Sequence, residues 1–358
     1  MPPIDPPIDL PIDTPIDPLL LAYQELSVTL PGMARPLLDG VSLSVAAGEA
    51  VALVGESGSG KSVTARAALG LLPAGAGTGG QVRVDGLEVI GADAATLRAV
   101  RTGKAAMIFQ DPRAGINPVR RVGEFLTEAL RVVGDRGRAA AELRAVELLD
   151  AVGLPDPRRQ LRQYPHQLSG GMLQRVMIAG ALASDPGLLL CDEPTTALDV
   201  TTQAEIMAIL RGLQRERGLG LLLITHDLDL AAACCDRIYV MYAGRIVETA
   251  TAADLLAAPR HPYSAGLLGS SPPLHGARER LRPIPGAPMG LLESAPGCGF
   301  APRCRFARPG LCDRTPPPLV PAVPGPGLVA CHLAEELTDA LTDALAAEAA
   351  ITPKEQVS

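Results

Sequence analysis

The sequence predicts an α/β fold in which helices cover a mostly parallel central sheet. Continuous apolar runs, which are typical of strands buried on both faces, occur at residues 50–54, 188–191, 221–225 and 238–241. Helix-like patterns separate these runs, and strands that alternate with helices build a layered domain around a parallel sheet. The chain has 358 residues, of which 47% are hydrophobic, so it can bury a large core.

Two half-buried strands are predicted ahead of the first apolar run. Residues 23–30 alternate partly between apolar and polar side chains, and residues 41–45 alternate more cleanly. Before them, residues 1–18 repeat a Pro-Ile-Asp unit every four residues. Because proline removes a backbone donor and biases its neighbour away from helix, we expect a disordered tail over residues 1–20.

Three elements are predicted between the first two apolar runs. They are a helix-like run over 62–72, a hairpin over 81–90 and a helix over 136–152. The last helix is expected to bury one apolar face, made of Ala139, Leu143, Val146 and Leu149. Gly153 and Pro155 then end it.

The composition changes after about residue 255, where prolines cluster. We expect a loop-rich C-terminal domain over 259–335 that needs a constraint besides a hydrophobic core, because so short a region buries little apolar surface. An Ala/Glu/Leu-rich stretch over 333–350 predicts a terminal helix, so residues 336–358 are expected to form this helix and a tail.

Charge and composition exclude several classes of protein. The chain carries 32 Lys and Arg against 39 Asp and Glu, and only 3% aromatic residues, which argues against a nucleic-acid partner. No apolar stretch approaches the roughly 18–20 residues of a membrane span, and no positive charge precedes Arg35 as in a secretory signal. We therefore expect the chain in the cytosol, where its seven cysteines would not form a disulfide scaffold.

A phosphate-binding loop is predicted between a buried strand and a helix. Residues 55–62 read Gly-Glu-Ser-Gly-Ser-Gly-Lys-Ser, which matches the P-loop pattern. Its glycines let successive backbone N–H groups face one anion, and the helix that follows points its positive end at the same phosphates. We expect Lys61 to reach the β- and γ-phosphates and Ser62 to ligate Mg²⁺. The predicted nucleotide-binding residues are Gly55, Ser57, Gly58, Ser59, Gly60, Lys61, Ser62 and Val63.

Two further motifs belong to the same chemistry. The apolar run 188–191 ends in Asp192 and Glu193, so a strand end beside the P-loop would place Asp192 near Mg²⁺ and Glu193 near the attacking water. Ser169-Gly170-Gly171 at a helix start is a second anion-binding terminus. Two such termini in one chain suggest that two chains face each other head to tail and complete each other's sites.

These motifs together resemble the ABC-type ATPase subunits over residues 21–269. The family's order is kept, from the P-loop through a Gln-loop at Gln110, the Leu-Ser-Gly-Gly signature and Asp192-Glu193 to a D-loop at 197–199 and a switch histidine, His226. The resemblance implies a P-loop ABC ATPase cassette over 21–258 with a parallel core sheet and an antiparallel β subdomain. It also implies a helical signature subdomain over about 111–185, and a Pro/Cys-rich C-terminal extension.

The resemblance also assigns roles. Glu193 would be the catalytic base, Gln110 would touch Mg²⁺ and water, and His226 would contact the γ-phosphate. Ser169, Gly170 and Gly171 would grip the γ-phosphate in the opposite subunit, and Asp199 would cross the dimer interface. The chain departs from the family at Leu30, where an aromatic side chain often stacks on adenine.

Several segments resemble the peptide-importer branch of this family. They are residues 110–112, 117–119, 164–166, 241–247, 261–263 and the cysteine-containing C-terminal segments. The resemblance implies an ATPase that drives dipeptide or oligopeptide import from the cytoplasmic face of the plasma membrane. Its partners would be a second ABC ATPase subunit in a heterodimer, two transmembrane permease subunits docked on residues 111–130 and an extracellular solute-binding protein.

Two alternatives remain for this function. One is the ATPase of an importer for nickel or another small solute, because other subunits choose the solute. The other is a soluble ABC ATPase of DNA repair or translation, which usually carries a coiled-coil insert or two cassettes; this chain has neither, and it is acidic.

The last four cysteines are candidates for a metal centre. Cys298, Cys304, Cys312 and Cys331 are separated by five, seven and eighteen residues, without the tight Cys-x2–4-Cys pairs of structural zinc sites. Some members of the resembling branch carry a four-cysteine 4Fe–4S cluster at this pattern, so the resemblance implies such a cluster. Zinc and unliganded buried thiols are the alternatives.

Overall fold

A computed structural model of the chain describes residues 19–134, 137–196, 198–270, 283–323, 325, 327–337 and 340–341. The expected N-terminal tail, Ala197 of the D-loop and most of the expected terminal helix over 333–350 lie outside the described residues. Residues 334–337 and 340–341 at the start of that stretch are helical.

The main sheet is built around parallel strands, as the sequence predicts. Among the described residues it has eight strands in the order β11-β12-β10-β9-β3-β8-β7-β6. The parallel ones are β3 (Ala50–Val54), β6 (Ala105–Ile108), β7 (Leu188–Asp192), β8 (Gly220–Thr225) and β9 (Arg237–Tyr242). β10 (Arg245–Thr251), β11 (Val320–Pro321) and β12 (Leu328–Val329) extend one edge with antiparallel pairs.

The register of the parallel strands brings four predicted site segments to one edge of the sheet. Ile108 pairs with Cys191, Asp192 with Ile224, and Val54 with Thr225, so the carboxyl ends of β6, β7, β8 and β3 are level. Open α/β sheets bind their ligands at this edge. The Gln-loop, the acidic pair, the switch histidine and the P-loop each follow one of these strands.

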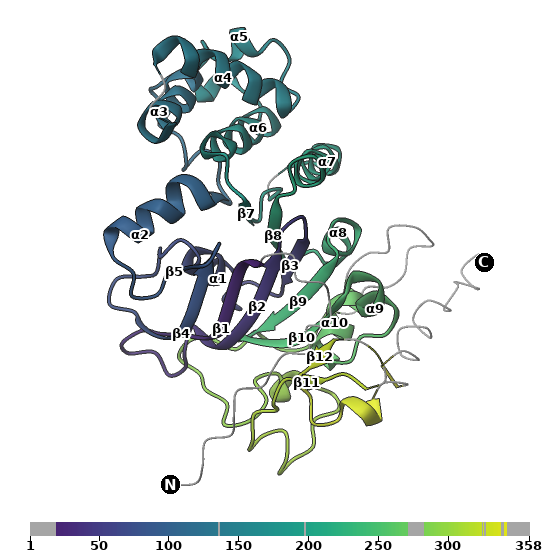
Figure 1. Ribbon diagram of the computed structural model, residues 1–358. Helices are drawn as coiled ribbons and strands as arrows, with labels where there is room; N and C mark the ends of the chain where they lie inside the picture. The colour runs from purple at the N-terminus through teal and green to yellow at the C-terminus, as the bar shows by residue number, and fades with distance from the viewer. Residues whose placement is uncertain are drawn as a thin grey trace, which may run out of the picture.

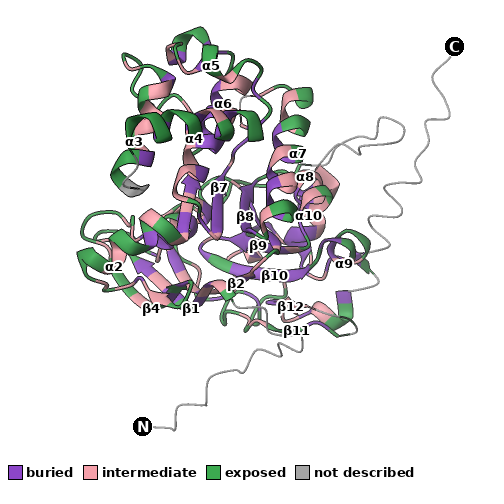
Figure 2. Cartoon of the chain, turned by 45° about the horizontal axis from the view of Figure 1, so that its top comes forward, coloured by how far each residue is buried: buried purple, intermediate pink, exposed green. Residues whose placement is uncertain are grey.

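Side chains of the parallel strands alternate between two cores. Ala52, Leu189 and Leu223 belong to one buried cluster, whereas Leu53, Leu190 and Leu222 belong to the other. The second cluster is shared with an antiparallel sheet of order β2-β1-β4-β5. Its strands are β1 (Leu19–Thr29), β2 (Leu38–Ala46), β4 (Gly77–Val84) and β5 (Leu87–Glu88). Figure 2 shows both layers with buried interiors.

The helix after the P-loop, α1 (Lys61–Ala67), is shorter than the predicted run over 62–72. The chain leaves the helix in a turn at 68–70, where Gly70 has a φ of 62°. The apolar residues Ala68 and Leu69 are buried in this turn, so the periodicity of the sequence continued past the end of the helix. The hairpin over 81–90 is confirmed by the antiparallel pair of β4 and β5.

A group of helices lies at the top of Figure 1 and shares a buried core with the main sheet. Its members are α3 (Val122–Gly134), α4 (Arg138–Ala151), α5 (Pro157–Gln160) and α6 (Gly170–Ala181). The predicted face of α4 is only partly right: Leu149 is buried and Val146 half-buried, but Ala139 is exposed and Leu143 is 55% exposed. The helix buries Ala141, Ala145 and Leu148 instead, because its alanine stripe lets it pack closely on α3 and α6.

The remaining helices flank the main sheet or connect strands. They are α2 (Ala94–Ala99), α7 (Val200–Arg217), α8 (Leu228–Cys234), α9 (Ala252–Ala257) and α10 (Pro262–Ser270), with short turns of helix at Val100–Lys104, Pro165–Gln167, Leu182–Ser184 and Ala301–Arg303. Within the part of the chain that is described, none of the helices has both the length and the apolar character needed to cross a membrane.

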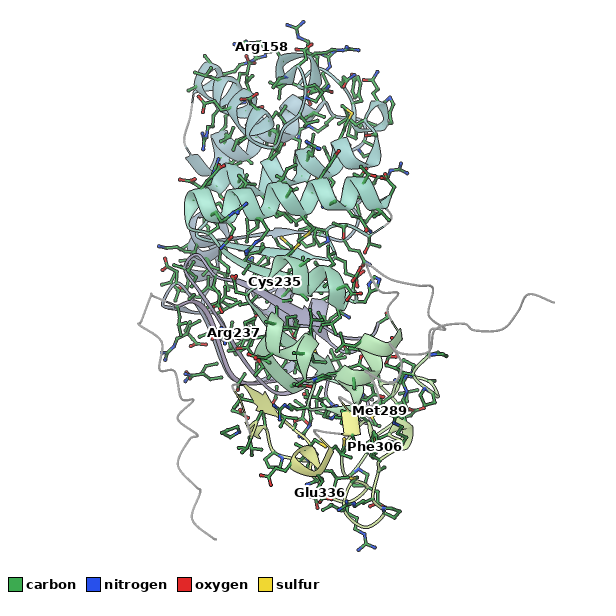
Figure 3. The ribbon with its side chains drawn as sticks, turned by 90° about the vertical axis from the view of Figure 1, so that its right-hand side faces the viewer. Arg158, Cys235, Arg237, Met289, Phe306 and Glu336 are labelled. Carbon is green, nitrogen blue, oxygen red and sulfur yellow. The ribbon has the colours of Figure 1, made fainter. Side chains whose placement is uncertain are left out.

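The C-terminal region is loop-rich, as predicted, and it joins the main sheet. Glu248 and Thr249 of β10 pair with Val329 and Leu328 of β12. A small cluster of Cys312, Leu333, Leu337 and Leu341 forms a core of its own. Figure 3 shows Met289, Phe306 and Glu336 at this lower end of the molecule, opposite Arg158 in the helical group.

Candidate nucleotide-binding site

The P-loop is held tightly between two neighbouring segments. A Cβ atom on Gly55 would lie 2.2 Å from the Met241 carbonyl oxygen, so only glycine fits there. Gly60 has a φ of 112°, and a Cβ on it would lie 2.8 Å from Cδ2 of Leu38. Ser57 and Gly58 are exposed at the tip of the loop, and Val63 lies half-buried in α1.

Lys61 points into the loop that it follows. Its Nζ donates to the carbonyl oxygens of Gly55, at 2.7 Å, and Glu56, at 2.9 Å. Burial lowers the pKa of Lys61, while the carboxylates of Glu193, Asp192 and Glu56 raise it. These carbonyl contacts hold the ammonium where phosphate oxygens could replace them. The hydroxyl of Ser59, also buried, has no hydrogen-bond partner among the described residues.

Ser62 and Asp192 form a pair that fits a divalent cation. The Ser62 hydroxyl donates to Oδ1 of Asp192 at 2.7 Å. Asp192 is 1% exposed, and its Oδ2 accepts no hydrogen bond from the described residues; Nη2 of Arg66 lies 3.8 Å away. Burial raises the pKa of Asp192, and the Ser62 hydrogen bond lowers it. Hard oxygen ligands of this kind suit Mg²⁺.

The carboxylate of Glu193 is contacted by side chains from the segments that follow strands β6, β7 and β8. Its Oε2 accepts hydrogen bonds from Gln110 Nε2, at 2.7 Å, and from the Thr196 hydroxyl, at 2.9 Å. Nδ1 of His226 lies 3.5 Å from its Oε1. The structure thus brings together Gln110, Glu193 and His226, which the sequence places in one site. Thr196 was missed, because a threonine after an acidic pair carries no signal of its own.

The signature segment and the D-loop lie against each other. Ser169 caps α6 by accepting the N–H of Met172 at 3.3 Å, and Asp199 caps α7 by accepting the N–H and the hydroxyl of Thr202 at 3.0 and 2.7 Å. These hydrogen bonds lower the pKa of Asp199. A Cβ on Gly171 would lie 2.5 Å from Cγ2 of Thr202.

Ser169, Gly170 and Gly171 do not join the P-loop of their own chain. Among the described residues, no hydrogen bond or ion pair connects residues 169–171 with residues 55–62. Ser169 and Gly170 are exposed. Their role in an opposite subunit stays a prediction.

The resemblance implies an aromatic side chain that stacks on adenine at the position of Leu30. Leu30 is half-buried there. Tyr23 is buried in the core, and its hydroxyl donates to the Thr64 carbonyl at 2.7 Å. Tyr23 therefore cannot stack on adenine in place of the missing aromatic residue.

The four C-terminal cysteines line one cavity together with apolar side chains that include Phe300, Phe306 and Leu333. All four are free thiols. In the present arrangement of the described residues, no group of three or more His, Cys, Asp or Glu side chains forms a metal-ion site. The structure therefore supports a shared cavity and leaves the metal centre a prediction.

The same cavity provides donors to its sulfur atoms. The N–H groups of Arg308 and Leu333 donate to Sγ of Cys312 and Cys331, both at 3.4 Å. Burial raises the pKa of Cys331 to about 12, and its hydrogen bond from Leu333 opposes this. Burial also raises the pKa values of Cys298 and Cys304, again against backbone hydrogen bonds. Cys234 ends α8, and Cys235, which follows it, is buried in the main core.

A link between this region and the P-loop was missed by sequence reasoning. Arg303 and Tyr263 both contact Glu56. Both lie in segments that mark the importer branch, 302–304 and 261–263. Both segments could be identified in the sequence, but their contact with Glu56 could not.

Comparison with known proteins covers most of the described chain. A model named "ABC transporter" matches residues 38–196, and one named "Oligopeptide/dipeptide transporter, C-terminal region" matches residues 247–312. The oligopeptide transport ATP-binding protein OppD of Escherichia coli is 45% identical over 300 residues, which cover 83% of this chain and 89% of that protein. The dipeptide transport ATP-binding protein DppD of Bacillus subtilis is 43% identical over 302 residues, which cover 83% and 90%.

One relative is much longer. The OppD protein of Mycobacterium tuberculosis is 50% identical over 289 residues, which are 80% of this chain and 47% of that protein. The chain therefore spans about half the length of this relative. Among solved structures, a dimeric ATP-binding cassette in a post-hydrolysis state with ADP and phosphate is 30% identical, with a TM-score of 0.58 over 65% of this chain and 98% of that one.

Proposed function

Because this chain belongs to the family of ATP-binding subunits of oligopeptide and dipeptide ABC transporters, we propose that it hydrolyses ATP to drive peptide import through a membrane complex. The observation that carries the proposal is the convergence at the carboxyl edge of the sheet. There the carboxylate of Glu193, contacted by Gln110 and His226, lies on the strand end next to the Ser62–Asp192 pair.

The residues divide the reaction among them. Lys61 exchanges its two carbonyl partners for phosphate oxygens, and the P-loop N–H groups hold the same phosphates. Ser62 and Asp192 would hold Mg²⁺, which neutralises charge on the β- and γ-phosphates when bound. Glu193 accepts a proton from the attacking water, while Gln110 and His226 orient the carboxylate and the water.

The second half of each site would come from another chain. Ser169, Gly170 and Gly171 would bind the γ-phosphate held by the opposite ATPase subunit, and Asp199 would cross the interface. Support comes from the exposure of Ser169 and Gly170 and from the absence, among the described residues, of hydrogen bonds between residues 169–171 and the P-loop of the same chain. We propose a second ABC ATPase subunit as the partner.

The membrane partners would dock beside the Gln-loop. Residues 111–130 follow Gln110 directly, and Val119 within them is 78% exposed. Most of residues 111–121 are exposed, so this stretch is open to a permease helix beside the Gln-loop. We propose two permease subunits and an extracellular solute-binding protein as the rest of the complex, with this chain on the cytoplasmic face of the membrane.

A transport assay tests the proposed substrate. The complex is assembled in vesicles with ATP inside the compartment that holds this chain, and uptake of labelled di- and oligopeptides and of nickel is measured. We expect peptide uptake that requires ATP and that stops in the Glu193→Gln variant. Uptake of nickel without peptide uptake would overturn the peptide assignment and leave the ATPase assignment intact.

We also propose that the cysteine-lined cavity holds a 4Fe–4S cluster. The support is the common cavity, the four free thiols and the backbone N–H groups directed at sulfur, which stabilise thiolate ligands. Metal ligation would also counter the burial that keeps Cys331 protonated. Protein purified without oxygen should be brown and contain iron and acid-labile sulfide. Colourless protein, or protein with stoichiometric zinc, would overturn the cluster.

A further inference from the structure

Glu56, the second residue of the P-loop, is held from outside the loop by a buried arginine. Arg303 Nη1 and Nη2 contact the two carboxylate oxygens of Glu56 at 2.6 and 3.0 Å, which makes the pair bidentate. The side chain of Arg303 is 6% exposed and that of Glu56 is 23% exposed. Nε of Arg303 is also used, since it donates to the Pro285 carbonyl at 2.8 Å. This bidentate pair holds the Glu56 side chain in one orientation and neutralises its charge.

Tyr263 holds the backbone of the same residue. Its hydroxyl accepts the N–H of Glu56 at 2.7 Å. The Tyr263 ring is fully buried and packs on Tyr242 and Phe300, with centroid distances of 4.8 and 5.3 Å. Phe300 and Tyr242 also lie beside the Arg303 guanidinium, each 5.8 Å from it. One aromatic cluster therefore supports both groups that grip Glu56.

Glu56 in turn contacts the lysine that would bind phosphate. Its carbonyl oxygen accepts from Nζ of Lys61 at 2.9 Å, and its carboxylate is one of the charges that raise the pKa of Lys61. A free carboxylate at this position would repel phosphate and compete for Lys61. Arg303 neutralises that charge, so it removes a penalty on nucleotide binding.

The other side of Arg303 is the cysteine-lined cavity. Arg303 directly precedes Cys304, and Phe300, Ala301 and Cys304 line the cavity. Residues 301–303 form one turn of helix, so a shift of Cys304 is transmitted to Arg303 without an intervening flexible segment. One chain of contacts from Cys304 to Lys61 passes through Arg303 and Glu56, and a second runs from Phe300 through Tyr263 to Glu56.

We propose that Arg303 and Tyr263 are positioning residues for nucleotide binding, and that through Glu56 they couple the P-loop to the cysteine-lined cavity. This inference rests on the proposed function, since ATP is the ligand whose binding is coupled. Coupling between two sites is reciprocal, so nucleotide must change the opening of the cavity as much as the state of the cavity changes nucleotide affinity.

The first test is a double-mutant cycle on the full chain, with binding of a Mg²⁺-bound non-hydrolysable ATP analogue measured by calorimetry. Arg303→Met should weaken binding about tenfold, because it leaves the Glu56 charge unpaired beside the phosphate site. Glu56→Gln alone removes the charge that Arg303 neutralises, so it should weaken binding much less than Arg303→Met does. In the double variant the unpaired charge is gone, so most of the lost affinity should return.

A matched control and a milder variant show whether Arg303→Met acts through Glu56 or through a general loss of structure. Arg308 pairs bidentately with Glu336 in the same C-terminal region, but this exposed pair lies away from the P-loop. Arg308→Met should leave nucleotide affinity unchanged. Tyr263→Phe keeps the ring packing and removes only the acceptor for the Glu56 N–H, so it should weaken the analogue several-fold without a loss of secondary structure.

The second test measures how the ATP analogue changes access to the cysteine-lined cavity. After any bound cluster has been removed with a chelator under reducing conditions, iodoacetamide alkylation of the four cavity cysteines, mapped by mass spectrometry, reports how often the cavity opens. The analogue should slow alkylation in the wild type and in Arg308→Met, and it should have no effect in Arg303→Met. Equal affinity in Arg303→Met and the wild type, or alkylation that ignores the analogue in the wild type, would overturn the coupling. Wild-type protein that binds no nucleotide would overturn the proposed function as well.

Discussion

Glu193 adopts an unusual backbone conformation for a carboxylate that we place in catalysis. Its φ is 47°, in the left-handed region that side chains with a Cβ rarely occupy. The N–H of Glu193 donates to the Ile224 carbonyl at 3.0 Å, which ties the residue to the neighbouring strand. Strained residues of this kind persist where the surrounding contacts determine them, and they are common in active sites.

At this residue we predict a separation of binding from turnover. Glu193→Gln keeps the size of the side chain and removes the base, so steady-state ATPase activity of the assembled complex should fall by about 10²- to 10⁴-fold. Nucleotide affinity should stay within about twofold, because the phosphate ligands are untouched. Phosphate release and equilibrium binding measure the two quantities.

Lys61→Ala is the matched control for that prediction. It removes the ammonium that Gly55 and Glu56 hold beside the phosphate position, so nucleotide binding itself should weaken. A Glu193→Gln complex with near-normal ATPase activity would show that another group takes the proton.

The start of helix α6 depends on its contact with helix α7. A Cβ on Gly171 would lie 2.5 Å from Cγ2 of Thr202, whereas one on Gly170 would lie 3.3 Å from the flexible Leu198 side chain. We therefore predict that Gly171→Ala destabilises the isolated chain by about 1–3 kcal/mol, the usual cost of overpacking. Chemical denaturation measures this change.

Two variants check the cause. Gly170→Ala should cost much less, because the leucine can move. Thr202→Ser removes Cγ2, so it should recover most of the stability of Gly171→Ala. If the double variant is no more stable than Gly171→Ala, the clash is not the cause.

Strand β10 carries a buried carboxyl that makes stability depend on pH. Burial raises the pKa of Glu248 to about 7, against the hydrogen bonds that its carboxylate accepts from the N–H groups of Arg260 and His261. Because the pKa of the folded state lies above the ordinary value, the stabilising effect of protonation is complete below about pH 4.5 and is lost as pH rises through about 7.

We predict that Glu248→Gln flattens this part of the pH profile. The difference in unfolding free energy between pH 5.5 and pH 8 should shrink by about 1–3 kcal/mol, which urea titrations at both pH values measure. A glutamine side chain has only one acceptor oxygen, so it cannot accept hydrogen bonds from both backbone N–H groups. The wild type and the variant are therefore compared by how their unfolding free energy changes with pH, and not by its absolute value. Parallel profiles for the wild type and Glu248→Gln would exclude Glu248 as the titrating group.

The molecule as a whole has one P-loop and one signature segment that do not meet. Figure 1 shows the signature helix α6 in the helical group, separated by the sheet edge from the helix α1 that follows the P-loop. Under the proposed function, a second ATPase subunit would complete the site. We predict slow ATP hydrolysis by the purified chain and a large increase when the partner ATPase and permease subunits are added.

Affinity purification from membranes checks the same prediction. A tagged chain should recover two permease subunits and a second ATPase. Full activity of the chain alone at a concentration where it is monomeric would contradict the shared site.

The C-terminal region is part of the same body as the cassette. It adds β12 to β10, it places Arg303 on the P-loop, and its Met289 and Gly290 carbonyls accept hydrogen bonds from Arg35. A proline-rich composition correctly predicted loops there. It did not predict that the loops would reach the nucleotide site.

Sequence alone determined the features that depend on neighbouring residues. The P-loop, the buried strands and the acidic pair are contiguous patterns whose chemistry is local, and their family was recognisable from their order. The tertiary structure decided what depends on residues far apart: which stripe of α4 is buried, that Glu193 meets Gln110 across 83 positions, and that Arg303 reaches Glu56 across 247. Two apolar stripes on one helix have nearly the same periodicity, so the sequence does not show which one is buried. Nor does it show which distant residue a charged side chain will pair with. Only the packing of strands and loops against each other selects the stripe and pairs the charges.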